Sequence, residues 1–419
     1  MKIILYGINY APEPVGIGKY SGELTQWLTH KGHDVRVITA PPYYPTWKIG
    51  KEYKNRYCIE LDKDLLVWRC PIWVPQRPNG LKRLLHLASF ALTSLPVLLI
   101  QKRWKPDVII TIAPAFFCAP NALLLKKICG CKTKGWLHIQ DFELDAAFEL
   151  GLLKGRFLRI IAEVWEKRIL RGFNRVSTIS NSMLIKLREK GVNNERCVIF
   201  PNWVDLSVIK PHHGLARQKN LYRKKLNIGD DKIVIMYSGS MNKKQDMNLL
   251  SEVILKLANI PQLIWLLAGE GPTKEDFVAA TSNLSQVIHL PLQPADQMNN
   301  WLNAADIHLL PQKAETADLV LPSKLLGILA SGRPVVACSP RDAELATLIN
   351  INQAGFCVNP GNSNAFAKAL RRFIDATELR EKAGRQARLL AKKNFDINNI
   401  LSHFEDQLAA LVNNTIQRN

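Results

Sequence analysis

Acidic residues are scarce in this sequence. It has 36 aspartates and glutamates against 56 lysines and arginines, which gives a formal net charge of +20. Such an excess suits nucleic acid, an anionic membrane surface or phosphorylated substrates, and charge alone does not choose among them. Residues 81–175 hold 16 basic against 7 acidic residues, so we expect one face of the first half to be basic.

Closely spaced cysteine pairs and an export signal are also lacking. None of the eight cysteines forms a Cys-x-x-Cys pair, and most lie in apolar runs where a thiol packs as a small hydrophobic group. We therefore expect no metal site and a reducing, cytoplasmic location. The N-terminus has no cleavable apolar core followed by small residues, so we expect it to form a first strand.

One run without charges, residues 84–100, is shorter than the roughly 20 apolar residues that cross a bilayer. Basic residues flank it, Lys82 and Arg83 before and Lys102 and Arg103 after. Three interpretations stay open: a helix in the membrane interface, a buried core helix and a membrane span. We favour the interfacial helix, because an apolar run with basic ends is typical of peripheral attachment to an anionic leaflet.

Length and strand pattern predict two α/β domains. A chain of 419 residues with 47% hydrophobic content is too long for one ordinary core. Short apolar strands alternate with helical patterns in both halves, which predicts parallel, doubly wound sheets. We place a first domain at residues 1–205, a second at 206–390, and a C-terminal helix at 391–419 that packs back on the first. Residues 40–80, rich in Pro, Tyr and Trp, predict a long ordered loop.

Gly16 and Gly18 lie between a strand expected at residues 3–6 and a following helix. Glycine lets the backbone approach a ligand, and the N-terminus of a helix favours negative charge. The spacing is not the GxGxxG dinucleotide fingerprint, so a plain turn is the alternative to a binding loop.

His138 ends another expected strand, and Asp141 follows three residues later. In open α/β sheets, ligands bind at the carboxyl ends of the strands. A structural histidine is the commoner explanation of a lone His, but the nearby acids Glu143 and Asp145 favour a functional one.

Three loops of the second half each follow an expected strand. They contain the candidate binding residues Gly239, Lys244, Gly269, Glu270, Gly271, Ser323 and Lys324. Ser323 and Lys324 follow Pro322 where a helix is expected to begin, so a hydroxyl, an ammonium and backbone N–H groups can converge on one phosphate. An ordinary loop, helix and strand is the alternative for that segment alone. Several such loops on one sheet edge are what a nucleotide diphosphate requires.

Together these stretches resemble the GT-B glycosyltransferases of family 4. The resemblance spans nearly the whole chain and rests on the GIGKY loop, the strand ending at His138, the Tyr237-Ser238-Gly239 loop, the Gly269-Glu270-Gly271 turn and the Pro-Ser-Lys-Leu segment. It implies two Rossmann-like domains facing across a cleft. It also implies a retaining transfer from a GDP- or UDP-linked nucleotide-sugar to a hydroxyl acceptor, with no metal or further cofactor.

The resemblance implies roles for the candidate residues. The donor-binding set is Gly239, Lys244, Gly269, Glu270, Gly271, Ser323 and Lys324. His138 would face the transferred sugar with Asp141 near it, while Gly16 and Gly18 would shape the acceptor side. Many members of the family carry two glutamates eight positions apart, but Leu319 and Gly327 occupy these positions here. The sugar contacts must then come from elsewhere, with Asp318 as a candidate.

The resemblance also implies a setting. The expected acceptor is a saccharide on undecaprenyl diphosphate in exopolysaccharide assembly of the colanic acid kind, with fucose among the candidate sugars. Such an enzyme would be cytoplasmic and bound peripherally to the anionic surface of the inner membrane. Two alternatives stay open: a nucleotide-sugar epimerase of the same fold, and a non-enzymatic basic binding protein. Nucleic acid is not an expected partner, because no RNA-binding motif is present.

Overall fold

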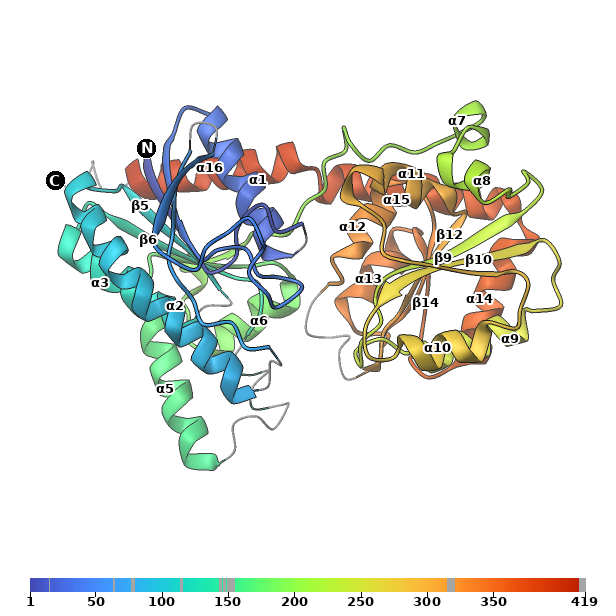
Figure 1. Cartoon of the computed structure of the whole chain (residues 1–419), viewed down its shortest axis with the longest axis horizontal. Helices are drawn as coiled ribbons and strands as arrows, with labels where there is room; N and C mark the ends of the chain where they lie inside the picture. The colour runs from blue at the N-terminus through green and yellow to red at the C-terminus, as the bar shows by residue number, and fades with distance from the viewer. Residues whose placement is uncertain are drawn as a thin grey trace. The chain divides into compact units, whose positions relative to one another are not determined.

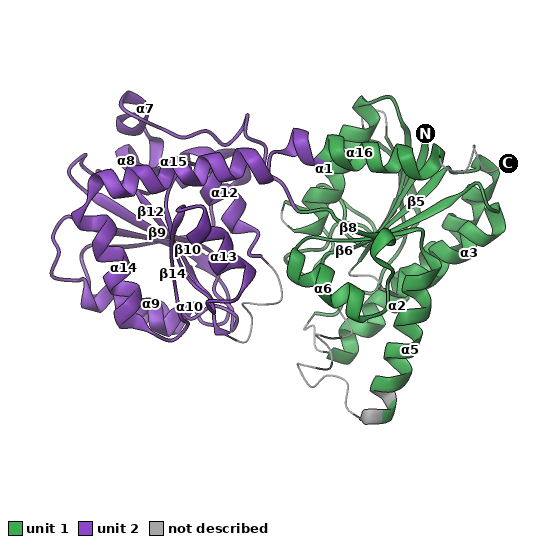
Figure 2. Ribbon diagram, turned by 180° about the vertical axis from the view of Figure 1, so that it is seen from behind, with its two compact units in different colours: residues 1–201, 401–419 green, residues 202–400 purple. Residues whose placement is uncertain are grey.

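The computed structural model describes every residue except 15, 63–64, 77–79, 114–115, 143–144, 146–147, 149–154, 315–320 and 414–419. Glu143, Asp318 and Leu319 therefore lie outside the described residues. The chain divides into two compact units (Figure 2), one of Met1–Pro201 with Leu401–Asn419 and one of Asn202–Ile400.

Unit 1 is built on an eight-stranded sheet with the strand order β3-β4-β2-β1-β5-β6-β7-β8. Its strands are β1 Lys2–Tyr6, β2 Asp34–Thr39, β3 Cys58–Asp62, β4 Leu65–Arg69, β5 Val108–Ala113, β6 Lys134–Ile139, β7 Arg175–Thr178 and β8 Cys197–Ile199. Neighbouring strands are parallel except for the antiparallel pair β3 and β4. The apolar run of β5 is buried along its whole length, as expected for a strand covered on both faces.

Residues 40–80 are not one long loop, so that prediction was wrong. β3 and β4 fall in this stretch and extend the edge of the sheet. β4 alternates buried and half-buried side chains, which is the pattern of a strand with one face on the core. The prolines and tyrosines that precede it dominate the composition and conceal this alternation.

Helices lie on both sides of this sheet (Figure 1). α1 Ile17–His30 and α16 Ile397–Asn413 lie on one side, and α2 Gly80–Ile100, α3 Ala119–Cys129 and α5 Arg156–Gly172 lie on the other. Unit 1 also contains η1 Gln101–Trp104, η2 Phe116–Cys118, α6 Asn181–Glu189 and η3 Asn194–Arg196. From Leu401 onward α16 packs on unit 1, where the ring of Phe404 stacks on Phe200 at 4.0 Å and meets Trp136 at 4.8 Å.

Unit 2 is built on a six-stranded sheet with the order β11-β10-β9-β12-β13-β14, and its paired strands are all parallel. The strands are β9 Ile233–Ser240, β10 Leu263–Glu270, β11 Val287–Leu290, β12 Ile307–Pro311, β13 Val335–Cys338 and β14 Gly355–Val358. The helices are α7 Leu215–Gln218, α8 Leu221–Lys225, α9 Met247–Lys256, α10 Lys274–Thr281, η4 Ala295–Gln297, α11 Met298–Ala304, α12 Lys324–Ala330, α13 Glu344–Ile351, α14 Ser363–Asp375 and α15 Thr377–Asn394. The prediction of two doubly wound α/β domains is confirmed.

Candidate functional site

Lys324, the first residue of α12, lies at the carboxyl edge of the unit 2 sheet beside the end of β9. Its Nζ donates to Tyr237 Oη at 3.2 Å and lies 4.4 Å from the centre of that ring. A Cβ atom added to Gly239 would lie 2.9 Å from the same Nζ. Tyr237 Oη in turn donates to the carbonyl of Ser240 at 2.6 Å. The structure therefore brings two predicted donor residues, Lys324 and Gly239, into one cluster.

The ammonium of Lys324 is poorly compensated in this cluster. Burial lowers the pKa of Lys324 to about 8, because removing a cation from water disfavours its charged form. Burial also raises the pKa of Tyr237 well above its usual range, so its hydroxyl stays neutral. An anion placed beside Lys324 would favour the charged ammonium, which makes this position suited to a phosphate. Tyr237 belongs to a motif that was identified in the sequence, but no role was predicted for it.

Gly269 and Gly271 let the ends of β9 and β10 approach each other. Gly269 is in register with Gly239, and a Cβ atom on Gly269 would collide with the Gly239 carbonyl. A Cβ atom on Gly271 would collide with the carbonyl of Met241. Both glycines therefore set the backbone path around the Lys324 cluster. Glu270, between them, is exposed and pairs with Lys274 at 2.7 Å.

Lys244 and Ser323 lie in the loops that adjoin this edge. Lys244 is exposed; its N–H donates to Asn242 Oδ1 at 2.9 Å, and its carbonyl accepts from the N–H of Lys313 at 3.1 Å. Ser323 is exposed at the N-cap of α12, so the helix begins where the Pro-Ser-Lys pattern predicts. A role for Lys244 or Ser323 in binding the donor stays a prediction.

Of the two positions that hold glutamate in many members of the family, the structure describes one, Gly327. Gly327 lies in the middle of α12, where a Cβ atom would come within 3.1 Å of Leu302. The close packing explains why a small residue suits this position. Leu319 and the substitute candidate Asp318 belong to residues 315–320, outside the described residues.

His138 is buried near the end of β6 rather than displayed on the surface. Its Nδ1 is 2.9 Å from Ser177 Oγ, and its ring meets Phe200 edge-on at 4.9 Å. Ser177 Oγ also accepts from Trp136 Nε1 at 2.8 Å, which fixes both rings. Burial lowers the pKa of His138 to about 3, so the imidazole is neutral at physiological pH. Any contact to a sugar would be a neutral hydrogen bond from Nε2.

Asp141 is exposed two residues beyond β6. Asp145, the other described acid between β6 and α5, binds Lys190 at 2.9 Å, and the same ammonium binds the buried Glu166 at 2.6 Å. Although burial opposes its charge, these two carboxylates raise the pKa of Lys190. Asp145 therefore takes part in a structural ion pair, and Asp141 is the described acid left to serve near a ligand.

Gly18 packs against a buried carboxylate that the sequence analysis missed. A Cβ atom on Gly18 would lie 2.6 Å from Glu13 Cβ and Oε2. Glu13 Oε1 accepts the N–H groups of Tyr43 and Tyr44 at 3.2 and 3.1 Å, and Oε2 accepts from the Asn9 amide at 2.9 Å. Burial raises the pKa of Glu13 despite these bonds. Glu13 thus ties two loops together at this edge of unit 1.

Gly16 is the N-cap of α1 and has φ of 65°, a backbone conformation that glycine adopts without strain. Its Cβ position is open apart from Tyr44, 3.9 Å away. The structure therefore explains Gly16 by backbone geometry and Gly18 by packing. A role for either in acceptor binding stays a prediction.

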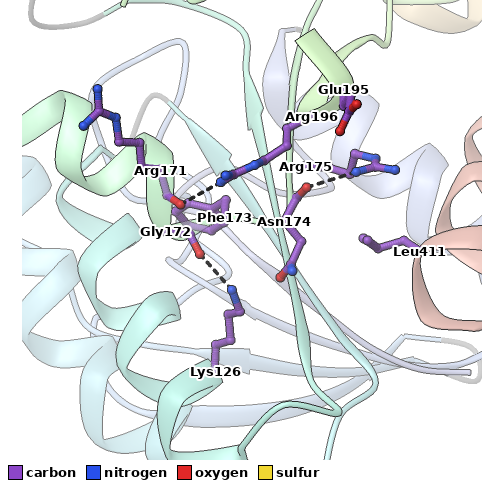
Figure 3. Close-up of a pocket in the computed structure, with 9 residues that line it drawn as sticks. All are labelled: Lys126, Arg171, Gly172, Phe173, Asn174, Arg175, Glu195, Arg196 and Leu411. Atoms are coloured by element: carbon purple, nitrogen blue, oxygen red, sulfur yellow. Dashed lines mark hydrogen bonds between the residues drawn. The ribbon is translucent and has the colours of Figure 1, made fainter. Parts of the chain in front are cut away.

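A surface pocket of unit 1 with a volume of about 440 Å³ lies away from these residues, beside the start of β7 (Figure 3). Two of its cations donate hydrogen bonds to carbonyls at the end of α5. Lys126 Nζ donates to the Gly172 carbonyl at 2.8 Å, and Arg196 Nη1 donates to that of Arg171 at 2.9 Å. The pocket is therefore explained by the capping of a helix C-terminus.

Comparison with known proteins matches both units. Residues 15–203 match the "Glycosyl transferase 4-like domain" model, and residues 218–390 match "Glycosyl transferases group 1". Over 411 residues the chain is 41% identical to the Escherichia coli K12 protein named "Putative colanic acid biosynthesis glycosyl transferase WcaI", covering 96% of this chain and 98% of that protein. It is 24% identical to the putative teichuronic acid biosynthesis glycosyltransferase TuaC of Bacillus subtilis, covering 85% of each.

Solved structures share the fold. Sucrose-phosphate synthase from Thermosynechococcus elongatus superimposes with a TM-score of 0.74 at 16% identity, covering 98% of this chain and 99% of that one. Anabaena HepE, solved in complex with UDP and glucose, gives a TM-score of 0.68 at 16% identity, covering 98% and 100%. At such identities the two structures speak to the fold alone.

Proposed function

The chain belongs to the GT-B glycosyltransferases of family 4, and we propose that it moves a sugar from a nucleotide-sugar to a saccharide carried on a membrane lipid diphosphate. Unit 2 would hold the donor and unit 1 the acceptor. The relative named WcaI points to exopolysaccharide assembly of the colanic acid kind. The donor would carry GDP or UDP, with fucose among the candidate sugars, and the lipid would be undecaprenyl diphosphate.

The observation that carries this proposal is the cluster of Lys324, Gly239 and Tyr237. Breaking the bond between sugar and phosphate leaves extra negative charge on the departing diphosphate. A fixed cation and nearby backbone N–H groups lower that barrier, because they are already oriented when the charge develops. Lys324 meets this demand with its ammonium held by Tyr237 at 3.2 Å and laid against Gly239.

On the acceptor side, His138 would act as a neutral group. With its pKa lowered to about 3 by burial, it neither carries charge nor exchanges a proton near neutral pH. It would orient a hydroxyl of the transferred sugar through Nε2, since Ser177 engages Nδ1 at 2.9 Å. We propose retention of anomeric configuration on family membership and name no covalent nucleophile.

A transfer assay tests this function. The purified protein is incubated with a panel of radiolabelled GDP- and UDP-sugars and with saccharides on polyprenyl diphosphate. We expect one of the donors to transfer its label to the lipid. This transfer should require both the enzyme and the acceptor. Conversion of the nucleotide-sugar into its epimer without any acceptor would overturn the proposal in favour of an epimerase.

A membrane lipid acceptor requires unit 1 to meet the bilayer surface, and α2 is suited to that. The segment Gly80–Trp104 is long and apolar enough to cross a membrane by length and composition. Ser94 of α2 is buried and bonds Tyr6 of β1 at 2.7 Å, so one face of the helix packs on the sheet. The opposite face leaves Leu85 and Leu92 more than half exposed. We therefore propose peripheral attachment at the cytoplasmic surface.

Reversing the charges at the two ends of α2 is expected to release the protein from anionic vesicles. Lys82, Arg83, Lys102 and Arg103 are exposed, and near an anionic leaflet each contributes about 1 kcal/mol. Changing all four to Glu should lower vesicle affinity at least about tenfold at low salt, where screening is weakest. Transfer to a soluble acceptor analogue should not change.

The matched control makes the same charge change on unit 2, at the exposed residues Lys224, Lys225, Lys392 and Lys393. It should bind vesicles better than the α2 variant. Equal loss in both variants would assign the effect to net charge, and wild-type protein that ignored anionic vesicles at low salt would make α2 a core helix.

A further inference from the structure

The N-terminal half of α5 exposes a row of large apolar side chains. Their exposed fractions are Phe157 77%, Ile160 50%, Ile161 49%, Val164 62% and Trp165 43%. The spacing i, i+3, i+4, i+7 and i+8 places all five on one face of the helix. We call this set the α5 stripe. Soluble proteins seldom expose so many large apolar side chains together on one face.

α5 packs on unit 1 mainly through its C-terminal end. The C-terminal end of the helix supplies the packing, because Ile169 and Leu170 are buried and Gly172 lies close against Leu123 of α3. The N-terminal half extends past the body of unit 1 (Figure 1). The α5 stripe is therefore not part of the hydrophobic core of unit 1.

The charged residues of α5 are distributed unevenly around the helix. The next two positions of the stripe, eleven and fourteen residues after Phe157, are the exposed Arg168 and Arg171. The two acids of the helix are engaged elsewhere: Glu163 binds Arg159 at 2.9 Å, and Glu166 is buried against Lys190 at 2.6 Å. The apolar face of α5 is therefore continued by two arginines toward the C-terminus of the helix, and neither of the two acids lies on it.

The neighbouring helices α2 and α3 also expose apolar side chains. α3 packs against both α2 and α5, on the same side of the sheet (Figure 1). α3 exposes Leu124 at 41% and Ile128 at 38%, and α2 exposes Leu85 at 53% and Leu92 at 73%. Apolar side chains are therefore exposed on three adjacent helices of one side of unit 1.

We propose that α5 inserts into the interface of an anionic bilayer, with the α5 stripe among the acyl chains and Arg168 and Arg171 at the lipid phosphates. An apolar face bordered by arginines is the form of helix that lies in a membrane interface. A second copy of the chain is a poorer occupant, because it would bring two arginine-bearing faces of a protein with net charge +20 together. This inference rests on the proposed function and deepens it by naming the element that meets the lipid. In chain order α5 follows β6, the strand of His138.

The test is co-sedimentation with vesicles of phosphatidylglycerol and phosphatidylcholine, at low salt and at high salt. Apolar insertion resists salt, whereas attraction between surface charges does not. We expect the Phe157→Asp/Val164→Asp double variant to lose at least tenfold in vesicle affinity at high salt. Both positions are more than half exposed, so the fold should be kept, which circular dichroism checks.

The matched control is Ile351→Asp/Leu389→Asp, at positions of unit 2 that are 74% and 55% exposed. It should bind vesicles like the wild type. The inference is overturned if the α5 variant binds vesicles at high salt as well as the wild type does. It is also overturned by a wild-type dimer that the α5 changes dissociate while vesicle binding is unaffected, because the stripe would then be a self-association face.

Transfer to a soluble acceptor analogue separates this inference from the proposed function. If the α5 variant transfers sugar normally in solution but no longer binds vesicles, both the membrane role of α5 and the proposed function are supported. If the variant still binds vesicles and transfers sugar, only the membrane role of α5 is contradicted. Failure of the wild type to transfer sugar from any donor overturns the proposed function whatever the vesicles show.

Discussion

Replacing Lys324 by alanine is expected to lower kcat/KM for the nucleotide-sugar by ten- to a hundred-fold. The ammonium of Lys324 lies 3.2 Å from Tyr237 Oη and against the backbone of Gly239, where a diphosphate is proposed to sit. A hydrogen bond to a charged group is worth about 1.5–3 kcal/mol, which converts to this range. Lys244→Ala is expected to act in the same direction. Steady-state kinetics and calorimetric binding of the nucleoside diphosphate measure both effects.

Lys256→Ala is the matched control, because Lys256 is an exposed lysine at the end of α9 with no proposed binding role. It should behave as the wild type. Unchanged turnover and unchanged nucleotide affinity in Lys324→Ala would remove Lys324 from the donor site.

The pH dependence gives Lys324 a second signature. Burial lowers its pKa to about 8, so the free enzyme loses the positive charge as pH rises through that value. Diphosphate affinity of the wild type should therefore weaken above pH 8, by at most about tenfold per pH unit. The alanine variant has no charge to lose there and should show a flatter profile.

Replacing His138 by alanine is expected to lower kcat by roughly a hundred-fold while nucleotide affinity changes little. A contact made to the sugar at the reacting centre acts mainly on the transition state, and removing one such hydrogen-bond donor commonly costs about 10²–10³ in kcat. The neutral imidazole predicted from burial also means that activity between pH 5 and 8 should not follow a histidine titration. Single-turnover kinetics separate these effects from binding.

Because His138 is buried between Ser177 and Phe200, its removal also changes packing. Ser177→Ala serves as the second variant, since it releases Nδ1 but keeps the ring. It should lower kcat less than His138→Ala does. A His138→Ala protein that melts like the wild type and turns over normally would make this histidine purely structural.

The sheets were predictable because their strands carry local signals. β5 is a short apolar run that is buried along its length, and β9 has a buried apolar middle, residues 234–237; a helix follows each strand in the chain, which is the pattern of a parallel doubly wound sheet. The candidate residues of unit 2 could also be found, because parallel strands bring their carboxyl ends to one edge. Gly239, Gly269 and Lys324 meet there as that argument requires.

Contacts between distant segments could not be predicted from local patterns. Nothing near Glu13 indicates that its carboxylate binds the N–H groups of Tyr43 and Tyr44. His138 contacts Ser177 and Phe200, and Phe200 in turn stacks on Phe404 of α16, which comes from the far end of the chain. The α5 stripe was missed for another reason. Arg159 and Glu163 lie among its apolar residues in the sequence, so the single apolar face is recognised only from the helical spacing together with the exposure of the side chains in the structure.

A crystal structure with bound UDP or GDP would show whether Lys324 and Gly239 hold the donor diphosphate. We expect the diphosphate at the carboxyl edge of the unit 2 sheet, with a phosphate oxygen within about 2.7–3.2 Å of Lys324 Nζ and beside the backbone of Gly239. A nucleotide bound with its phosphates away from Lys324 and Gly239 would contradict this expectation.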